Sequence, residues 1–112
     1  MAYDDIQSRK EFFDVLASAV ADVKQLRAKT PHFWAWENAE RQLLAMHDWT
    51  KNGRTPTQKE RESIDVQVVV GREAGDTDDV FLYEFKQKVT GLAYYFEFWP
   101  SDPNAPVKSP YE

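Results

Sequence analysis

The residues best suited to acid–base chemistry in this sequence are His47 and its neighbour Asp48. A histidine oriented by a carboxylate can act as a general base. Consecutive residues on a helix point about 100° apart, however, so these two side chains are not expected to pair directly. His32 is the only other histidine in the chain. We therefore expect an exposed His47 beside a solvated Asp48, without a catalytic or metal-binding role.

Carboxylates could instead hold a metal ion. Glu37 and Glu40 lie one turn apart on a predicted helix, and Glu60 lies on the next predicted helix. Di-metal helix bundles, however, use a glutamate followed three residues later by histidine, and this pattern is missing here. The aspartates within residues 76–79 lack the later ligands of a calcium-binding loop. A solvated acidic face without a metal is the expected outcome.

Other reactive groups are missing from the sequence. The chain has no cysteine, which excludes disulfides, thiolate metal sites and cysteine nucleophiles. Its four glycines form no phosphate-binding motif, and no serine lies in a nucleophile-elbow sequence. We therefore expect no enzyme and no cofactor, with a small enzyme or metal carrier built on His47 or on Glu37 and Glu40 as an alternative.

The elements that would position these residues are predicted to be helical. Apolar residues recur every three to four positions from about residue 4 to residue 29, which predicts an amphipathic helix. Its stripe consists of Phe12, Leu16, Ala19, Val23 and Leu26. Thr30-Pro31 then predicts the cap and first residue of a second helix that ends near Trp49. The inner stripe of that helix consists of Trp36, Ala39, Leu43 and Met46. Asn52-Gly53 predicts a turn after it.

The third predicted helix competes with a strand. Thr55 as a cap, Pro56 as the first residue and Gln58 as a capping-box partner predict a helix from Pro56 to about Val70. Arg61, Ile64 and Val68 would share one of its sides. The segment 64–68 also alternates like a strand, and β-branched valines continue it. The start signal favours the helix, and the alternative stays open.

A last helix is predicted after a loop at residues 71–76. Asp76 or Thr77 can cap this helix, and the acidic Asp78 and Asp79 suit its positive end. Its apolar stripe consists of Phe81, Phe85, Val89, Leu92, Phe96 and Trp99. The aromatic segment 94–99 would also suit a strand.

Together these elements predict an all-α fold, a small bundle of about four antiparallel helices. The length of 112 residues fits one domain. Four prolines follow between residue 100 and the C-terminus and exclude a helix there. We therefore expect a helical domain at residues 1–99 and an extended Pro-rich tail at residues 100–112.

The charge and hydropathy of the chain limit the classes of partner that it can bind. Fourteen Lys and Arg against nineteen Asp and Glu give a formal net charge of -5. Nucleic-acid binding requires a basic face and is not expected. No apolar run is long enough to cross a bilayer, and Met1–Lys10 is too polar for a secretory signal. The expectation is a cytoplasmic protein that is steered towards a positively charged protein partner.

Aromatic residues make up 14% of the chain. Phe33, Trp34 and Trp36 lie on different sides of the second predicted helix, so the core cannot bury all three rings. Tryptophan and tyrosine commonly anchor protein interfaces. A partner-facing aromatic side chain is therefore as good an expectation as packing in the core or under the tail.

Three short motifs resemble those of a known family. They are Ala39-Glu40-Arg41-Gln42-Leu43, Arg72-Glu73 and Asp76-Thr77-Asp78. Through them the segment from Pro31 to about Phe96 resembles the small all-helical immunity proteins that neutralise NAD(P)-glycohydrolase toxins of bacterial type VI secretion. The resemblance implies an all-α fold and a stoichiometric inhibitor that blocks the cleft where the dinucleotide enters its toxin.

The expected function is therefore that of an immunity protein that binds and blocks a cognate effector toxin. The alternative is a helical interaction or regulatory module that acts as a homodimer. The expected partner-binding side chains are acidic and exposed, with one aromatic. They are Trp34, Glu37, Glu40, Asp48, Glu60, Glu62 and Asp65.

Overall fold

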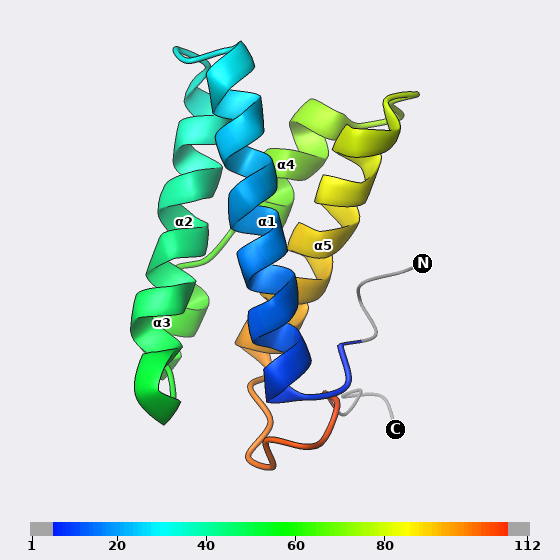
Figure 1. Cartoon of the computed structure of the whole chain (residues 1–112). Coiled ribbons are helices and arrows are strands. Elements are labelled where there is room, and N and C mark those ends of the chain that lie inside the picture. Colours follow the sequence, from blue (N-terminus) through cyan, green and yellow to red (C-terminus); the bar gives the residue numbers. More distant parts are fainter. Residues whose placement is uncertain (1–5, 108–112) are drawn as a thin grey trace.

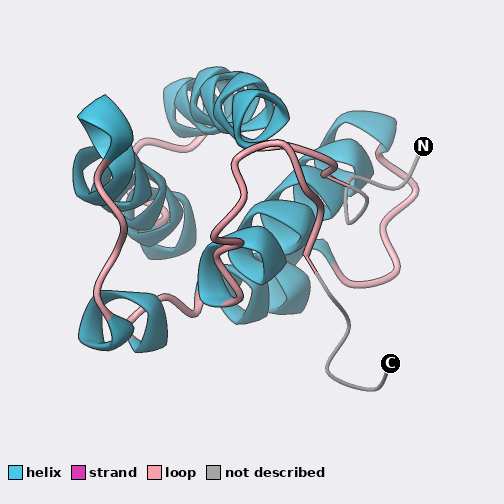
Figure 2. Ribbon diagram, turned by 90° about the horizontal axis from the view of Figure 1, so that it is seen from below, coloured by secondary structure: helices cyan, strands magenta, loops and turns pink. Residues whose placement is uncertain are grey.

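A computed structural model describes residues 6–107 as helices joined by short loops (Figure 1). The four longer helices are α1 (Arg9–Lys29), α2 (Trp34–Thr50), α4 (Val66–Ala74) and α5 (Val80–Glu97). The 3-10 turn η2 (Lys51–Gly53) and the short helix α3 (Gln58–Glu62) connect α2 to α4. Figure 2 shows the same helices from below, with no strand in this range. The predicted all-α fold is confirmed.

The four longer helices alternate in direction along the chain. In the view of Figure 1, α1 runs upward, α2 downward, α4 upward and α5 downward. α1 packs against α2 and α5, and α4 packs against the same two helices. This arrangement is an antiparallel bundle in which α2 and α5 lie diagonally opposite each other.

The core follows the predicted stripes of α1 and α2. Both stripes are buried, except that Leu26 at the end of α1 is only partly buried. From α5 the core receives Phe85, Val89, Leu92 and Phe96, also as expected. No helix in the described range is both long and apolar enough to cross a membrane.

The connection between α1 and α2 differs from the prediction. Thr30 ends α1 instead of starting α2, because its backbone N–H and its hydroxyl both donate to the Leu26 carbonyl, at 3.1 and 3.0 Å. Pro31 lies in the following turn, and α2 begins only at Trp34, after Phe33 in extended backbone. A Thr-Pro pair fits a helix end as well as a helix start, so the local signal was ambiguous.

The predicted helix from Pro56 to Val70 is two helices. Thr57, and not Thr55, caps α3: its hydroxyl accepts from the Glu60 N–H, and the Glu60 carboxylate accepts from the Thr57 N–H. The capping box was therefore real but misplaced by two residues. After a break at residues 63–65 the chain resumes as α4, which confirms helix over strand at the valine-rich segment.

The length of α4 differs from the prediction. Val66, Val69 and Val70 are buried, whereas Val68 is 46% exposed and lies on the outer side of the helix. The loop predicted from residue 71 begins only at Gly75, because α4 continues to Ala74. A single glycine does not end a helix whose next turn still buries a side chain, here that of Ala74.

Two ends of the remaining helices are set by local signals. Asn52 and Gly53 have positive φ values of 59° and 79°, as expected of the turn after α2. Asp79 caps α5 by accepting from the Leu82 N–H, so the cap lies two residues after Thr77. Helix α5 then continues to Glu97, which makes most of the segment 94–99 helical and leaves only its end in a turn.

The described part of the Pro-rich tail, residues 100–107, contains no helix but turns back below the first turn of α1 (Figure 1). The Arg9 N–H donates to the Pro103 carbonyl at 2.8 Å, and its guanidinium donates to the Pro100 carbonyl. The same guanidinium lies 4.4 Å from the Trp99 ring. Arg9 thus fastens this segment to the helical domain; residues 108–112 lie outside the described range.

Candidate functional site

The outward side of α2 carries a continuous stripe of exposed side chains. Trp34, Glu37, Arg41, Leu44 and Asp48 recur at spacings of three and four residues, which places them on one helix face. Trp34 is 55% exposed and Leu44 is 43% exposed. Trp34 and Leu44 are therefore the large apolar side chains of α2 that are exposed.

An open groove runs beside this stripe, between α2 and the break that separates α3 from α4. The end of the groove at the start of α2 is lined by Trp34, Glu37, Asn38 and Arg41. It continues past Gln42, Ala45 and Trp49 from α2, and its opposite wall consists of Ser63, Ile64 and Asp65. Asn38 and Arg41 belong to both parts and make them one surface.

A buried glutamine holds the two walls together. The Gln42 amide nitrogen donates to Asn38 Oδ1 and to Asp65 Oδ1, each at 2.7 Å. Its carbonyl oxygen accepts from the Asp65 N–H at 2.9 Å. Because Asp65 immediately precedes α4, these bonds attach the start of α4 to α2 and make the groove rigid.

Trp34 is supported from below by other rings. It contacts Phe33 edge-on, with ring centroids 6.4 Å apart. Phe33 in turn contacts the buried Trp36 at 5.4 Å. At the other end of the groove Trp49, which is half-buried, stacks against Phe96 of α5 at 6.3 Å. Each tryptophan therefore presents one part to solvent from a fixed position, the arrangement that lets an aromatic side chain anchor a partner.

Arg41 lies in the groove without a charged partner. Within residues 6–107 its guanidinium forms no ion pair and no hydrogen bond, and the neighbouring Glu37 carboxylate forms none either. An arginine with five free donors can bind a carboxylate or a carbonyl group of another molecule in a bidentate manner. Arg41 and Trp34 are thus the two residues of this surface that are best suited to recognition.

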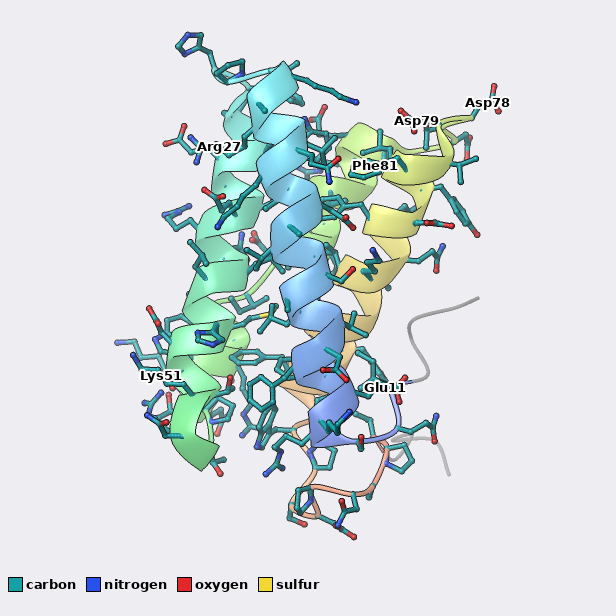
Figure 3. All side chains as sticks on the ribbon, in the orientation of Figure 1. Glu11, Arg27, Lys51, Asp78, Asp79 and Phe81 are labelled. Atoms are coloured by element: carbon teal, nitrogen blue, oxygen red, sulfur yellow. The ribbon has the colours of Figure 1, made fainter. Side chains whose placement is uncertain are left out.

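Two of the expected partner-binding acids have structural roles instead. Glu40 Oε1 accepts from Arg27 Nη1 at 2.6 Å, and only 15% of its side chain is exposed, so it ties α2 to α1 near the position labelled in Figure 3. Glu60 accepts from Arg54 Nη2 at 3.0 Å and completes the α3 capping box. The hydrogen bond from Arg54 lowers the pKa of the Glu60 carboxyl, with the Thr57 bonds adding to the effect.

The other five predicted residues do not all lie together. Trp34, Glu37 and Asp65 line the groove. Asp48 lies further down α2, where its carboxylate is 3.7 Å from the Lys51 ammonium. Glu62 accepts from Gln58 at 2.9 Å on α3. The structure therefore brings three of the seven predicted residues together on one surface.

The alternative of an enzyme or metal site finds little geometry to support it. His47 Nδ1 comes within 4.0 Å of Asp48 Oδ1, closer than the helix geometry suggested but beyond hydrogen-bonding distance, and both side chains are more than half exposed. Glu40 is engaged by Arg27 and is not free to join Glu37. Among the described residues, no group of three or more metal-ligating side chains could hold a metal ion.

Asn38, Arg41, Trp49 and Ile64 are groove residues that we did not predict. For Arg41 a signal existed, because it lies one turn after Glu37 and two turns after Trp34 on the same face. No comparable signal marks Ile64, since its position depends on the break between α3 and α4. In comparisons with known proteins, no family model, curated protein or solved structure matches this chain.

Proposed function

We propose that this chain is a protein-binding domain that works as an immunity protein: it binds a cognate bacterial effector toxin and blocks it. The single observation that carries the proposal is the pair of Trp34 and Arg41, an aromatic ring that is 55% exposed beside a guanidinium unpaired within the described range. Tryptophan and arginine are the residue types that most often dominate binding energy at protein interfaces.

The groove is built for binding without a change of shape. Its walls are joined by the two hydrogen bonds between Gln42 and Asp65, and Trp34 rests on Phe33. A surface that is already ordered before binding loses little conformational entropy on association. This property supports a slow dissociation rate, which a stoichiometric inhibitor needs.

The overall charge supports a fast association rate. The chain carries a net charge of -5, and a toxin cleft that holds an anionic dinucleotide is commonly basic. Attraction between the two would raise the association rate at low ionic strength. An NAD(P)-glycohydrolase is the toxin class that the sequence resemblance suggests, and the cytoplasm is the compartment where such an inhibitor would act.

The proposal predicts that an effector is encoded next to this gene, and the purified toxin domain of that effector tests it. Calorimetry should detect tight binding of one toxin domain to each chain, and adding the protein should abolish the toxin's activity. Trp34→Ala and Arg41→Ala should each weaken binding by about tenfold or more. Tyr83→Ala on α5 is the matched control for an exposed aromatic residue, and Lys24→Ala on α1 is the control for an exposed cation.

Two results would contradict the proposal in different ways. A lack of binding at about 10 µM of each protein would reject the immunity function for that toxin. Tight binding that neither Trp34→Ala nor Arg41→Ala weakens would keep the function and reject the groove as the binding site.

A further inference from the structure

The groove beside α2 presents hydrogen-bond donors whose direction can be deduced. The Asp65 backbone N–H can only donate, and the Gln42 carbonyl oxygen accepts from it. The Gln42 amide nitrogen must therefore face Asn38, and the Asn38 carbonyl oxygen must accept from it. This turns the two N–H groups of the Asn38 amide away from Gln42, and neither of them donates to a described residue. They are available to a partner in the groove.

The charged and apolar groups of the groove follow one another along α2. Glu37 and Arg41 line it one turn apart, and neither side chain forms an ion pair or hydrogen bond within the described part of the chain. An exposed pair at this spacing is screened by solvent, so any attraction between the two withholds neither charge from a partner. One turn further on, Ala45 begins an apolar hollow that Trp49 and Ile64 complete. The order along the groove is therefore acid, base and apolar hollow.

The spacing of these three features matches an extended chain. Glu37, Arg41 and Ala45 are four residues apart on a helix, which separates neighbouring positions by about 6 Å along its axis. Alternate side chains of an extended chain lie on one face, roughly 6.6 Å apart. An extended segment can therefore place three alternate side chains opposite these three positions in turn.

The two walls of the groove also offer partners for the main chain of such a segment. On the α2 wall, the free N–H groups of Asn38 can donate to a carbonyl oxygen. On the opposite wall, Asp65 accepts from Gln42 through Oδ1, and its Oδ2 binds no described residue and can accept a backbone N–H. A helix satisfies its own backbone groups and would leave these two side chains unused, whereas an extended segment needs such partners. The polar groups of the groove therefore favour an extended occupant.

We propose that the groove binds an extended segment of the toxin in which a cation, a carboxylate and an apolar side chain occupy alternate positions. The cation lies opposite Glu37, the carboxylate lies opposite Arg41, and the apolar side chain fills the hollow beside Ala45. Each charge of the segment then meets its opposite, whereas a segment with the two charges exchanged would meet a like charge at both positions. This specificity rests on the proposed function and states which part of a toxin would contact the groove.

Short peptides test this specificity without the toxin. The probe is the blocked peptide Lys-Ser-Glu-Ser-Leu, used together with its reverse, Leu-Ser-Glu-Ser-Lys, because the spacing allows both chain directions. The control exchanges the two charges, as Glu-Ser-Lys-Ser-Leu and its reverse. In NMR titrations of the full chain, a probe should shift the indole N–H resonances of Trp34 and Trp49 with a dissociation constant of about 1 mM. The controls should bind about fivefold more weakly, and the backbone amide of Tyr83 on α5 should not shift.

A variant with exchanged charges provides the decisive comparison. Glu37→Arg combined with Arg41→Glu keeps the net charge and alters only exposed side chains, so circular dichroism should show an unchanged helix content. The variant should prefer the control peptides over the probes by about fivefold, which reverses the preference of the native chain. A preference that does not reverse overturns the proposal. Equal affinities of the native chain for probes and controls also overturn it, as does the absence of indole shifts at about 5 mM peptide.

The results with peptides and with the toxin separate this specificity from the proposed function. Peptide binding with the expected preference, but no binding of the toxin, would reject the immunity function and keep the specificity of the groove. Toxin binding that Trp34→Ala weakens, but no preference among the peptides, would keep the immunity function and reject this segment as the occupant.

Discussion

Gln42 and Asp65 exchange two hydrogen bonds across the bundle, one from the Gln42 amide to the Asp65 carboxylate and one from the Asp65 backbone to the Gln42 carbonyl oxygen. The two residues are 23 positions apart in the sequence. Their contact holds Asp65, the residue directly before α4, against α2 and joins the two walls of the candidate groove.

Replacing Gln42 should destabilise the bundle and distort the groove. Gln42→Leu keeps the volume but leaves the Asp65 N–H without its acceptor, at a cost of about 1–3 kcal/mol. Urea denaturation measures the loss. Asn38→Ala is the control, because it removes only one of the bonds to Gln42 and should cost about 1 kcal/mol. A Gln42→Leu variant as stable as the native chain would contradict this role.

The ion pair between Lys88 and Asp22 should contribute to stability. Lys88 Nζ lies 2.8 Å from both Asp22 Oδ2 and Ser18 Oγ, and the two charged side chains are only 12% and 14% exposed. Asp22→Asn should cost about 2 kcal/mol, because it removes a carboxylate that lies 2.8 Å from a largely buried ammonium.

The matched control for this pair lies on the same helix, α1. Lys10 and Asp14 are 3.3 Å apart, but their side chains are 88% and 67% exposed. Solvent screens such a pair, so Asp14→Asn should change stability by less than about 0.5 kcal/mol. Thermal unfolding of both variants at one ionic strength makes the comparison, and equal losses would show that burial does not matter here.

Glu60 should make the stability of the α2–α4 connection depend on pH. Its pKa is lowered in the folded protein, mainly by the hydrogen bond from Arg54, so the folded state favours the ionised carboxylate. The resulting stabilisation is present above the ordinary carboxyl pKa and is lost as the pH falls through the folded-state value. Glu60→Gln should therefore lower the melting temperature at pH 7.

The pH profile of the same variant provides the check. The difference in melting temperature between Glu60→Gln and the native chain should shrink as the pH is lowered below about 4. Glu62→Gln, at an exposed glutamate of the same helix that bonds only to Gln58 in the described structure, is the control. A difference that stays constant with pH would show that the Glu60 charge is not responsible.

Two glycines near the end of α4 should respond in opposite directions to alanine. Gly71 lies inside α4, and nothing lies within 4 Å of the position that a Cβ would occupy. Gly71→Ala should raise stability by about 0.5–1 kcal/mol, because alanine loses less backbone entropy in a helix. Gly75 has a φ of 39° and a ψ of -130°, which an L-residue rarely adopts, so Gly75→Ala should destabilise the protein. If residue 71 lay in a loop, as the sequence suggested, the gain from Gly71→Ala would disappear.

The helical stripes of α1, α2 and α5 could be predicted because their information is local. Each helix repeats apolar residues at helical spacing, and that spacing alone determines which face is buried. The all-α class and the antiparallel order followed from four such segments and short loops. In the candidate site, Trp34 and Glu37 were predictable for the same reason, since both follow from their place on the outer face of α2.

Only the tertiary structure decided the rest, because the deciding contacts join residues far apart in the chain. α4 begins directly after the residue that Gln42 of α2 bonds, Asp65, and no local signal marks that bond. In the sequence nothing distinguishes Glu40 from an exposed glutamate. Its ion pair exists because the packing of α1 on α2 brings Arg27 to within 2.6 Å of it. The groove itself exists only where α2 meets the break after α3. Sequence periodicity determines which side of a helix faces inward, whereas packing between helices determines which outward side chains remain free to bind.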